Sequence, residues 1–557
     1  MNVHPAEARR ARIFSWLEIA LIVLLALVPL FATFPYRVNI FLSWEGAYRL
    51  SEGQMPYRDF GMPLGYMFWA VPALFFKLFG PQLVTLVKAQ VFINIVSGLA
   101  FRSILKSLDV QPGIRLLSVL LYVLSYSFFN FWPWYNHTVI VYGMVGLAFT
   151  LRYISRGTGR LSWAWLVGAA LFVFFSFFTK QDGGGLAFVL CAALLLAHSL
   201  YEKKWLPLVV FVGSFALITT AFLLPLTRYS FGYWFNHGQP PHVARISAFE
   251  IVDEFFYASQ WIKFYLFLVV LLLVVSFRSF REFFANKRIT LFALLTLGIL
   301  AEAAIIQITS YTPPDNNIFF HAFAFALVMT LLAEKMAINF FRWKPLAVAG
   351  LGMLLWWSGT FWKYFQRIAQ RALPATEVAS TSGENVVNRK TYMIDIHPTG
   401  EVPTSQWVYS GLKSFDKIYM PPATAEGMKR LLNMDLVKAH RAAGDLRVLN
   451  MSELTPLAVE MPYKLETGPD IPLWYHLGVA MFNREAKMYE DKIARGHYDL
   501  VLFQHIPSLN NFYPFRVREA LLQHYQKVDS FTAPRRGDTQ GLIEVYLPAR
   551  ARTDSAR

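Results

Sequence analysis

The chain has 557 residues, of which 55% are hydrophobic and only 16% are charged. Soluble domains average about 25% charged residues, so this composition excludes an ordinary soluble protein. In a soluble chain, the formal net charge of +16 would suggest nucleic-acid binding. Here the basic residues lie mainly in short gaps between apolar runs. That placement favours membrane topology and contact with anionic membrane lipids, and we expect no nucleic-acid partner.

Apolar runs of about 18 residues or more predict a polytopic α-helical membrane protein. Eleven spans are predicted, at residues 14–34, 82–101, 114–131, 137–151, 161–179, 185–200, 206–226, 261–277, 289–308, 318–333 and 345–362. The first has three arginines before it and no small-residue cleavage site after it, which indicates a retained anchor. Another apolar run, 63–80, is interrupted by two prolines and a lysine and predicts a helix along the membrane surface.

Basic residues gather at every second junction between the predicted spans. By the positive-inside rule, this alternation places the N-terminus in the cytoplasm and the C-terminal region outside the plasma (bacterial inner) membrane. The opposite junctions carry carboxylates, histidines, prolines and aromatic residues. The residues at these junctions include Glu45, Asp59, Lys180, Asp182 and His237. We therefore expect these side chains on the extracytoplasmic side.

The composition divides the chain into two predicted domains. Residues 1–374 form the transmembrane domain with an extracytoplasmic loop at 35–81, and residues 375–557 form a soluble extracytoplasmic domain. In the second domain, strand-like runs at 415–421, 446–451, 498–504 and 542–548 alternate with helical patterns at 424–441, 481–495 and 514–527. This alternation predicts an α/β or α+β fold.

The most informative stretch is 43–60, SWEGAYRLSEGQMPYRDF, followed by PLGY and later KLFG. It resembles the first extracytoplasmic loop of the GT-C type integral-membrane glycosyltransferases, the superfamily of protein mannosyltransferases and aminoarabinose transferases. The resemblance is good over roughly residues 40–106 and weaker over the rest of the membrane part. It implies transfer of a sugar from a polyprenyl-phosphate carrier to a glycan, lipid or protein acceptor. Many relatives carry Asp-Glu-Gly where this chain has Trp44-Glu45-Gly46.

Glu45 and Asp59 are the candidate catalytic residues, because transfer to a hydroxyl needs a base and a carboxylate is a suitable one. An inverting displacement needs no covalent intermediate. The structural alternative is that Glu45 caps a juxtamembrane helix and Asp59 pairs with Arg58 or Arg49.

Lys180 and Gln181 end the fifth predicted span and precede Asp182 and three glycines, a Lys-Gln pair that also resembles the family. Lys180 is a candidate for binding the carrier phosphate, with the glycines letting the backbone approach closely. The alternative is that Lys180 only extends to the membrane interface beside Asp182.

The predicted loop after the seventh span places Arg228, His237 and Arg245 among aromatic residues, a combination that suits a lipid phosphate and a sugar ring. His237 together with Glu45 or Asp59 is a weak candidate for a divalent metal site. The sequence contains no P-loop and no dinucleotide fingerprint, so no nucleotide cofactor is expected.

Two other functions fit the same features. A transporter or flippase of lipid-linked saccharides would use the same cations without a base, but most mid-span positions here are apolar, with Glu302 as the main exception. An inactive saccharide-binding relative is the other alternative, and Trp44 in place of the usual acid favours it.

Overall fold

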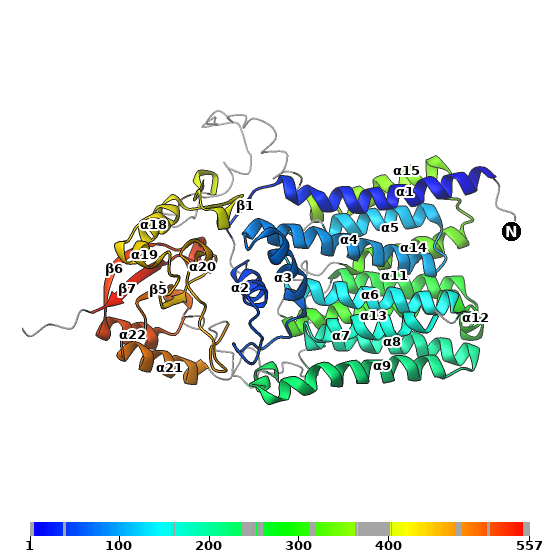
Figure 1. Cartoon of the computed structure of the whole chain (residues 1–557). Coiled ribbons are helices and arrows are strands. Elements are labelled where there is room, and N and C mark those ends of the chain that lie inside the picture. Colours follow the sequence, from blue (N-terminus) through cyan, green and yellow to red (C-terminus); the bar gives the residue numbers. More distant parts are fainter. Residues whose placement is uncertain are drawn as a thin grey trace, which may run out of the picture.

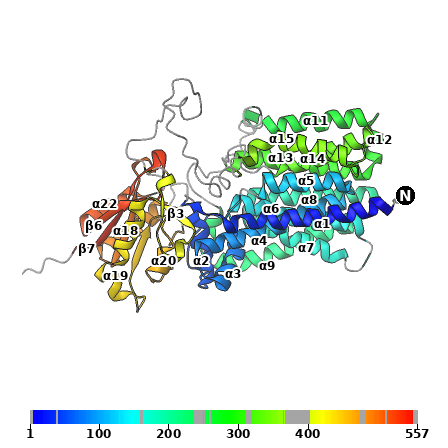
Figure 2. The ribbon, with the colours of Figure 1, turned by 90° about the horizontal axis from the view of Figure 1, so that it is seen from above.

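The computed structural model describes residues 5–36, 40–127, 130–157, 162–235, 260–310, 319–362, 404–473, 482–509 and 513–549, with a few isolated positions between them. The described chain forms a long helical bundle joined at one end to a smaller unit of strands and helices (Figure 1). The N-terminus lies at the other end of the bundle (Figure 2). The predicted domain boundary at 374 falls outside the described residues.

Each of the eleven predicted spans coincides with a helix of the bundle. These helices are α1 (Pro5–Leu27), α4 (Leu83–Ser107), α5 (Pro112–Ser125), α6 (Tyr135–Arg156), α7 (Ser162–Phe177), α8 (Gln181–Glu202), α9 (Leu206–Leu223), α11 (Gln260–Ser276), α13 (Lys287–Ser310), α14 (Phe320–Lys335) and α15 (Trp343–Trp356). Of the described helices, six are long and apolar enough to cross a membrane, namely α1, α4, α6, α8, α9 and α13. The other five have 14 to 17 residues, so the number of crossings stays a prediction.

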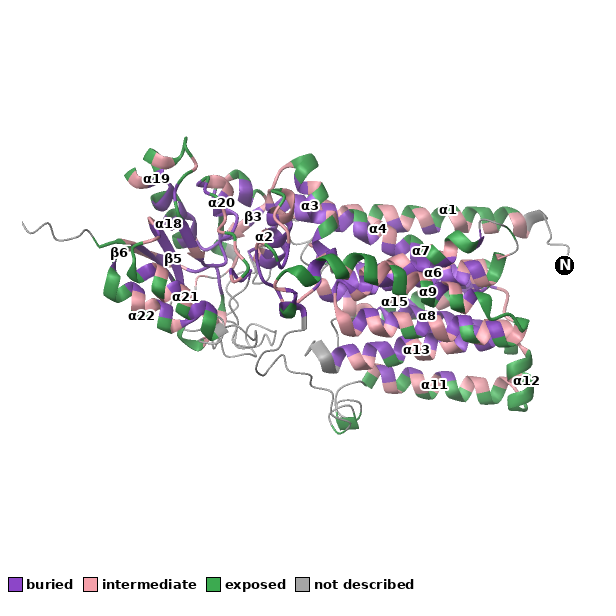
Figure 3. Cartoon of the chain, turned by 60° about the horizontal axis from the view of Figure 1, so that its bottom comes forward, coloured by how far each residue is buried: buried purple, intermediate pink, exposed green. Residues whose placement is uncertain are grey.

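The bundle has the surface of an integral membrane protein. Large apolar side chains stand on its outer faces, with Trp16 of α1 and Leu217 of α9 each 72% exposed. Figure 3 shows that α1 and α11 are buried along one face and exposed along the other. A soluble monomer rarely exposes apolar surface on this scale, whereas a lipid-facing helix requires it.

Two shorter helices, α2 (Ile40–Ser51) and α3 (Met67–Phe79), lie at the end of the bundle that meets the C-terminal unit (Figure 1). The predicted surface helix at 63–80 corresponds to α3, which contains Pro72 and ends at Gly80. The two helices pack closely at Gly46, where a Cβ would lie 2.0 Å from the Trp69 ring. Any larger residue at position 46 would therefore separate α2 from α3.

The C-terminal unit is a four-stranded sheet with helices packed on it. Its strand order is β4-β5-β7-β6, formed by Val448–Met451, Leu500–His505, Leu542–Pro548 and Tyr525–Thr532. Strands β4 and β5 are parallel, and α21 (Phe482–Ala494) precedes β5 in the connection between them, while the other two pairings are antiparallel. The accompanying helices are α18 (Pro422–Leu432), α19 (Asp435–His440), α20 (Leu457–Glu460) and α22 (Phe515–His524). The mixed α/β class predicted from the sequence is confirmed.

The structure differs from the sequence prediction in two elements of this unit. The helix predicted at 424–441 is broken between α18 and α19 at Asn433 and Met434. The helix predicted at 514–527 ends at His524, and the chain turns directly into β6. Strand β6 has no clear alternation of apolar residues, because several of its side chains face solvent.

A second, three-stranded sheet joins the N-terminal part to the C-terminal unit. Strand β1 (Phe34–Pro35) pairs in parallel with β3 (Ile418–Met420), which pairs with β2 (Val408–Tyr409) in the antiparallel direction. Tyr36 extends this connection by donating its hydroxyl hydrogen to the carbonyl of Glu453. One continuous hydrophobic core runs from α2 and α3 into the C-terminal unit. The two parts are therefore packed as one body rather than tethered by a linker.

Candidate active site

Helix α2 positions the residues that resemble the glycosyltransferase motif. Trp44 is fully buried, donates its indole N–H to the carbonyl of Pro81 at 2.9 Å and stacks on Tyr48 with ring centroids 4.6 Å apart. Successive helical residues project about 100° apart, so Glu45 faces a different direction from Trp44. Position 44, where many relatives carry an acid, is a packing position in this chain.

Glu45 is held by Arg49 one helical turn later. The Nε and Nη2 atoms of Arg49 both lie 3.0 Å from Oε1 of Glu45. The Arg49 side chain is 5% exposed and the Glu45 side chain is 13% exposed. Burial raises the pKa of Glu45 above its ordinary value, while the neighbouring guanidinium acts in the opposite direction. The same guanidinium donates to the Gln54 amide oxygen and to the Glu466 carbonyl, both at 2.9 Å. Arg49 thus connects α2 to the C-terminal unit.

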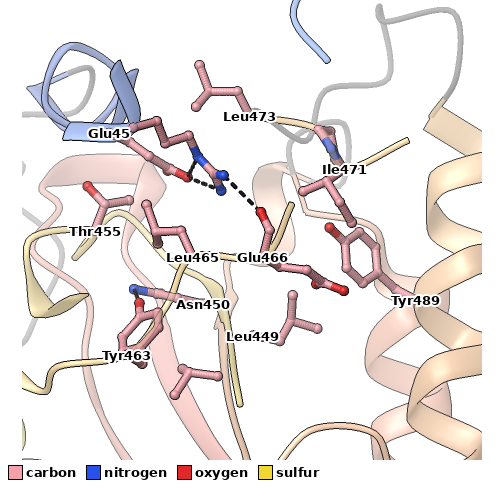
Figure 4. A pocket seen from close by; sticks show the side chains of 13 residues that line it. Glu45, Leu449, Asn450, Thr455, Tyr463, Leu465, Glu466, Ile471, Leu473 and Tyr489 are labelled. Carbon is pink, nitrogen blue, oxygen red and sulfur yellow. Dashed lines mark hydrogen bonds and ion pairs between the residues drawn. The ribbon is translucent and has the colours of Figure 1, made fainter. Parts of the chain in front are cut away.

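A cavity of about 40 Å³ lies between α2 and the C-terminal unit (Figure 4). Glu45 lines it from the α2 side, and Asn450, Tyr463 and Glu466 are among the residues of the C-terminal unit that line it. Arg49 of α2 also lines the cavity. A water molecule occupies roughly 30 Å³ in the liquid, and pockets for drug-sized ligands measure about 300–1,000 Å³. The cavity in this conformation has room for water but not for a sugar.

Asp59 lies in a turn of the same loop and is paired with its neighbour Arg58. The Nε of Arg58 donates to Oδ1 of Asp59 at 3.0 Å, and the backbone N–H of Met55 donates to Oδ2 at 2.7 Å. The hydrogen bond from Arg58 lowers the pKa of the Asp59 carboxyl, and Arg49 adds a smaller electrostatic contribution in the same direction. This arrangement matches the structural alternative for Asp59 and makes it a weaker base than Glu45.

The first loop is also bonded to the C-terminal unit through its backbone. The Gly61 N–H donates to the carbonyl of Ile471 at 2.7 Å, and the Leu473 N–H donates to the carbonyl of Gly61 at 3.0 Å. The Gly468 N–H donates to the Asp59 carbonyl at 2.8 Å. The segment 468–473 therefore covers the loop like an added strand and closes one side of the cavity.

Lys180 and Gln181 mark the start of α8 at the same end of the bundle. The Lys180 ammonium lies 2.8 Å from Oδ2 of Asp182, and these side chains are 12% and 18% exposed. The Gln181 amide donates to the carbonyl of Trp234 at 2.6 Å. Gly184 packs so closely on α7 that a Cβ would lie 2.1 Å from its backbone. Its role in this structure is therefore helix packing.

The segment after α9 brings a third part of the chain to this region. Arg228 ends the short helix η3 (Leu224–Arg228) and is exposed, and the following Tyr229 lies close enough to influence Arg58 electrostatically. In η4 (Phe231–Phe235), Tyr233 donates its hydroxyl hydrogen to the carboxylate of Glu485 in α21. This bond connects the segment after α9 to the C-terminal unit.

The predicted site residues therefore fall into two groups. Glu45, Asp59, Lys180, Gln181 and Arg228 all lie at the end of the bundle that carries the C-terminal unit, although each carboxylate already has an arginine partner. The predicted residues His237 and Arg245 lie outside the described residues.

The arginine partners also bear on the candidate metal site. Within the described part of the chain, no cluster of three or more His, Cys, Asp or Glu residues is arranged to hold a metal ion. The two carboxylates considered as ligands, Glu45 and Asp59, are held by guanidinium groups in this conformation. We assign no step of the reaction to a metal ion.

Two features of this region were missed from the sequence. Arg49 follows Glu45 by four residues, so helical spacing predicts the pair once α2 is recognised as a helix. The contact between Tyr233 and Glu485 joins residues 252 positions apart, and no local pattern indicates it.

Asn450 begins the glycosylation sequon Asn450-Met451-Ser452. Its side-chain amide donates to the carbonyl of Leu454 and to the hydroxyl of Tyr463 beside the cavity.

The apolar helical bundle and the C-terminal unit together define an integral membrane protein with a mixed α/β unit packed on one end. No protein-family model matches the chain, and no curated protein matches it. Among solved structures, ArnT from Cupriavidus metallidurans in the apo state is similar over 96% of this chain and 98% of its own, with 10% identity and a TM-score of 0.48. The same protein bound to undecaprenyl phosphate matches over 95% and 97%, with 12% identity and a TM-score of 0.47.

Proposed function

We propose that the protein transfers a sugar from a polyprenyl-phosphate carrier to a glycan, lipid or protein acceptor of the cell envelope, with inversion at the anomeric carbon. The observation that carries this proposal is Glu45, a carboxylate only 13% exposed in the loop that resembles the glycosyltransferases, which lines a cavity between α2 and the C-terminal unit. The reaction takes place on the extracytoplasmic side, at the end of the bundle where this unit lies.

In the proposed reaction, the acceptor oxygen bonds to the anomeric carbon, the bond from that carbon to the carrier phosphate breaks, and the phosphate leaves with the electron pair. Glu45 accepts the proton of the acceptor hydroxyl. Burial strengthens the carboxylate as a base by raising its pKa, and Arg49 orients it.

Lys180 is the proposed partner of the carrier phosphate. Its ammonium is bonded to Asp182 in this structure, so the phosphate would compete with that carboxylate. Charge-assisted hydrogen bonds of this kind are worth about 1.5–3 kcal/mol. The variant Lys180→Ala should therefore raise the donor concentration needed for half-maximal rate by about tenfold or more, with little change for the acceptor. If the apparent donor affinity is unchanged in a folded variant, Lys180 has only an interfacial role.

The size of the cavity adds one requirement to the mechanism. A sugar needs more space than about 40 Å³, so the acceptor can reach Glu45 only when the segment 468–473 moves away from the first loop. Loops that cover active sites commonly open on microsecond to millisecond timescales.

The decisive experiment compares wild type with Glu45→Gln and Asp59→Asn in membranes, using a radiolabelled polyprenyl-phosphate sugar and a glycan acceptor. Glutamine keeps the shape and hydrogen bonding of Glu45 but cannot accept the proton. We expect Glu45→Gln to reduce turnover by about 10²–10⁴-fold. Glu52→Gln is the matched control, because Glu52 follows α2 and is exposed. Full activity in both Glu45→Gln and Asp59→Asn would disprove the assignment of the base to this loop.

An inactive saccharide-binding relative is the second candidate, and two observations favour it. Trp44 is buried where an acid is usual, and the cavity beside Glu45 is too small for a sugar in this conformation. This candidate predicts that wild type binds the lipid-linked sugar without turnover at any acceptor concentration. Turnover by wild type would exclude it.

A further inference from the structure

A second pocket lies at the end of the bundle that is remote from the C-terminal unit, between the last turns of α4 and α6. Its volume is about 100 Å³. It is lined by Arg102, Ser103, Lys106, Ser107, Arg152 and Arg156. Four of these six side chains are cationic, and the other two carry hydroxyl groups.

Negative charge near the pocket is scarce among the described residues. Glu18 of α1 is fully buried and accepts from Nε of Arg102 at 2.7 Å and from Nε of Arg115 at 2.8 Å. One carboxylate therefore serves two arginines. The remaining lining cations, Lys106, Arg152 and Arg156, have no ion pair with a described carboxylate.

Arg152 is further positioned by an aromatic neighbour, since its guanidinium lies 5.1 Å from the ring centroid of Trp165. Counting Arg115 with the four lining cations gives five positive charges against the single negative charge of Glu18, a net charge of +4. Like charges repel, so a concave cluster of this kind is favourable mainly when an anion occupies it.

We propose that this pocket binds a phosphate-bearing anion. Arginine donors and hydroxyl groups are suited to phosphate oxygens, and basic pockets between membrane helices bind anionic lipid headgroups. The pocket is much smaller than the roughly 300 Å³ of a typical organic-ligand site, so only a small charged group enters it. On the same helix α4, Phe92 and Leu99 are 49% and 39% exposed, which provides an apolar face for acyl chains.

The shared chemistry is the phosphate, and two sources can present it: the headgroup of an anionic phospholipid or a water-soluble phosphate compound. This site is remote from the first loop and does not depend on the proposed sugar transfer. Its test measures lipid binding, so it can fail while the transferase assignment stands, or the reverse.

The experiment titrates the delipidated, detergent-solubilised full chain with phosphatidylglycerol or phosphatidylcholine and counts bound lipids by native mass spectrometry. The test variant is the triple substitution Lys106→Gln, Arg152→Gln, Arg156→Gln. Arg102 is left intact because its removal would take away one of the two partners of the buried Glu18 carboxylate. Each cation near an anionic lipid contributes a factor of about five in affinity, so the triple variant should bind phosphatidylglycerol about 100-fold more weakly.

The matched control is the triple substitution Arg281→Gln, Arg342→Gln, Lys344→Gln, which removes the same charge from exposed residues outside the pocket. A second variant, Ser107→Leu, fills the pocket and keeps every cation. It tests the same site if the triple variant fails to fold. Both pocket variants should lose the preference for phosphatidylglycerol, while the control should keep it.

The source is identified by adding glycerol phosphate to the lipid-bound protein. Displacement at millimolar concentration would identify a soluble phosphate compound, and retention of the lipid would identify the headgroup. The proposal is overturned if wild type binds neither phosphatidylglycerol in preference to phosphatidylcholine nor glycerol phosphate, or if the control triple loses binding as strongly as the pocket triple.

Discussion

Replacing Glu485 by glutamine should make the attachment of the C-terminal unit insensitive to pH. Glu485 is 1% exposed and accepts a hydrogen bond from the Tyr233 hydroxyl, while its second oxygen has no partner within the described residues. Burial raises the pKa of Glu485 from 4.5 to about 8. The neighbouring Arg484 is paired with Asp470 rather than with Glu485.

The direction of the effect follows from proton linkage. An acid with a raised pKa binds its proton more tightly in the folded state than in the unfolded state. The folded state is therefore most favoured below pH 4.5 and loses stability as the pH rises towards about 8. The slope is about 1.4 kcal/mol per pH unit, which amounts to roughly 3 kcal/mol at pH 7 and about 4–5 kcal/mol above pH 8. Glutamine does not titrate, so the variant avoids this loss.

The assay is thermal unfolding of the detergent-solubilised full chain between pH 5 and pH 9. The difference in melting temperature between Glu485→Gln and wild type should be near zero at pH 5 and should grow by several degrees by pH 8. Glu519→Gln, at an exposed position of α22, is the control and should follow wild type at every pH. A difference of constant size across the whole range would refute the reasoning, because a titrating group must change it.

Two further predictions use the same melting assay, and a third uses the yield of folded protein and its activity. Gly184→Ala should cost about 1–3 kcal/mol by overpacking against α7, whereas Gly185→Ala, with open space around its Cβ, should be neutral; equal effects would contradict the packing role. Glu453→Gln breaks the ion pair with Arg535, in which the Glu453 and Arg535 side chains are 2% and 5% exposed, and should lower the free energy of unfolding by about 3–5 kcal/mol. Asp529→Asn breaks the exposed pair with Arg430 and should lower it by less than about 1 kcal/mol. Trp44→Asp restores the acid found in relatives but buries a charge, so we expect loss of folded protein rather than added activity; a folded, more active variant would disprove this.

Much of the architecture follows from local pattern. Every predicted span coincides with a helix, because an apolar run of this length can satisfy its backbone in lipid only by forming intrahelical hydrogen bonds. The strands β3, β4, β5 and β7 were predicted for a similar reason, since buried strands are short apolar runs bounded by turns. Strand β6 was missed because its exposed side chains weaken that signal. The sequence also singled out the first loop, whose motif resembles that of the GT-C glycosyltransferases.

Only the tertiary structure decided what the residues of that loop do. The sequence presents Trp44 and Glu45 as adjacent alternatives, but helical geometry directs the tryptophan into the core and the carboxylate towards the cavity. The sequence left Glu45 and Asp59 both open as the base, with a slight preference for Glu45, and the structure shows Asp59 paired with Arg58. The cavity itself depends on Arg49 meeting the carbonyl of Glu466, 417 positions further along the chain. Contacts at such separations depend on how whole elements pack, and a local sequence pattern contains no information about that packing.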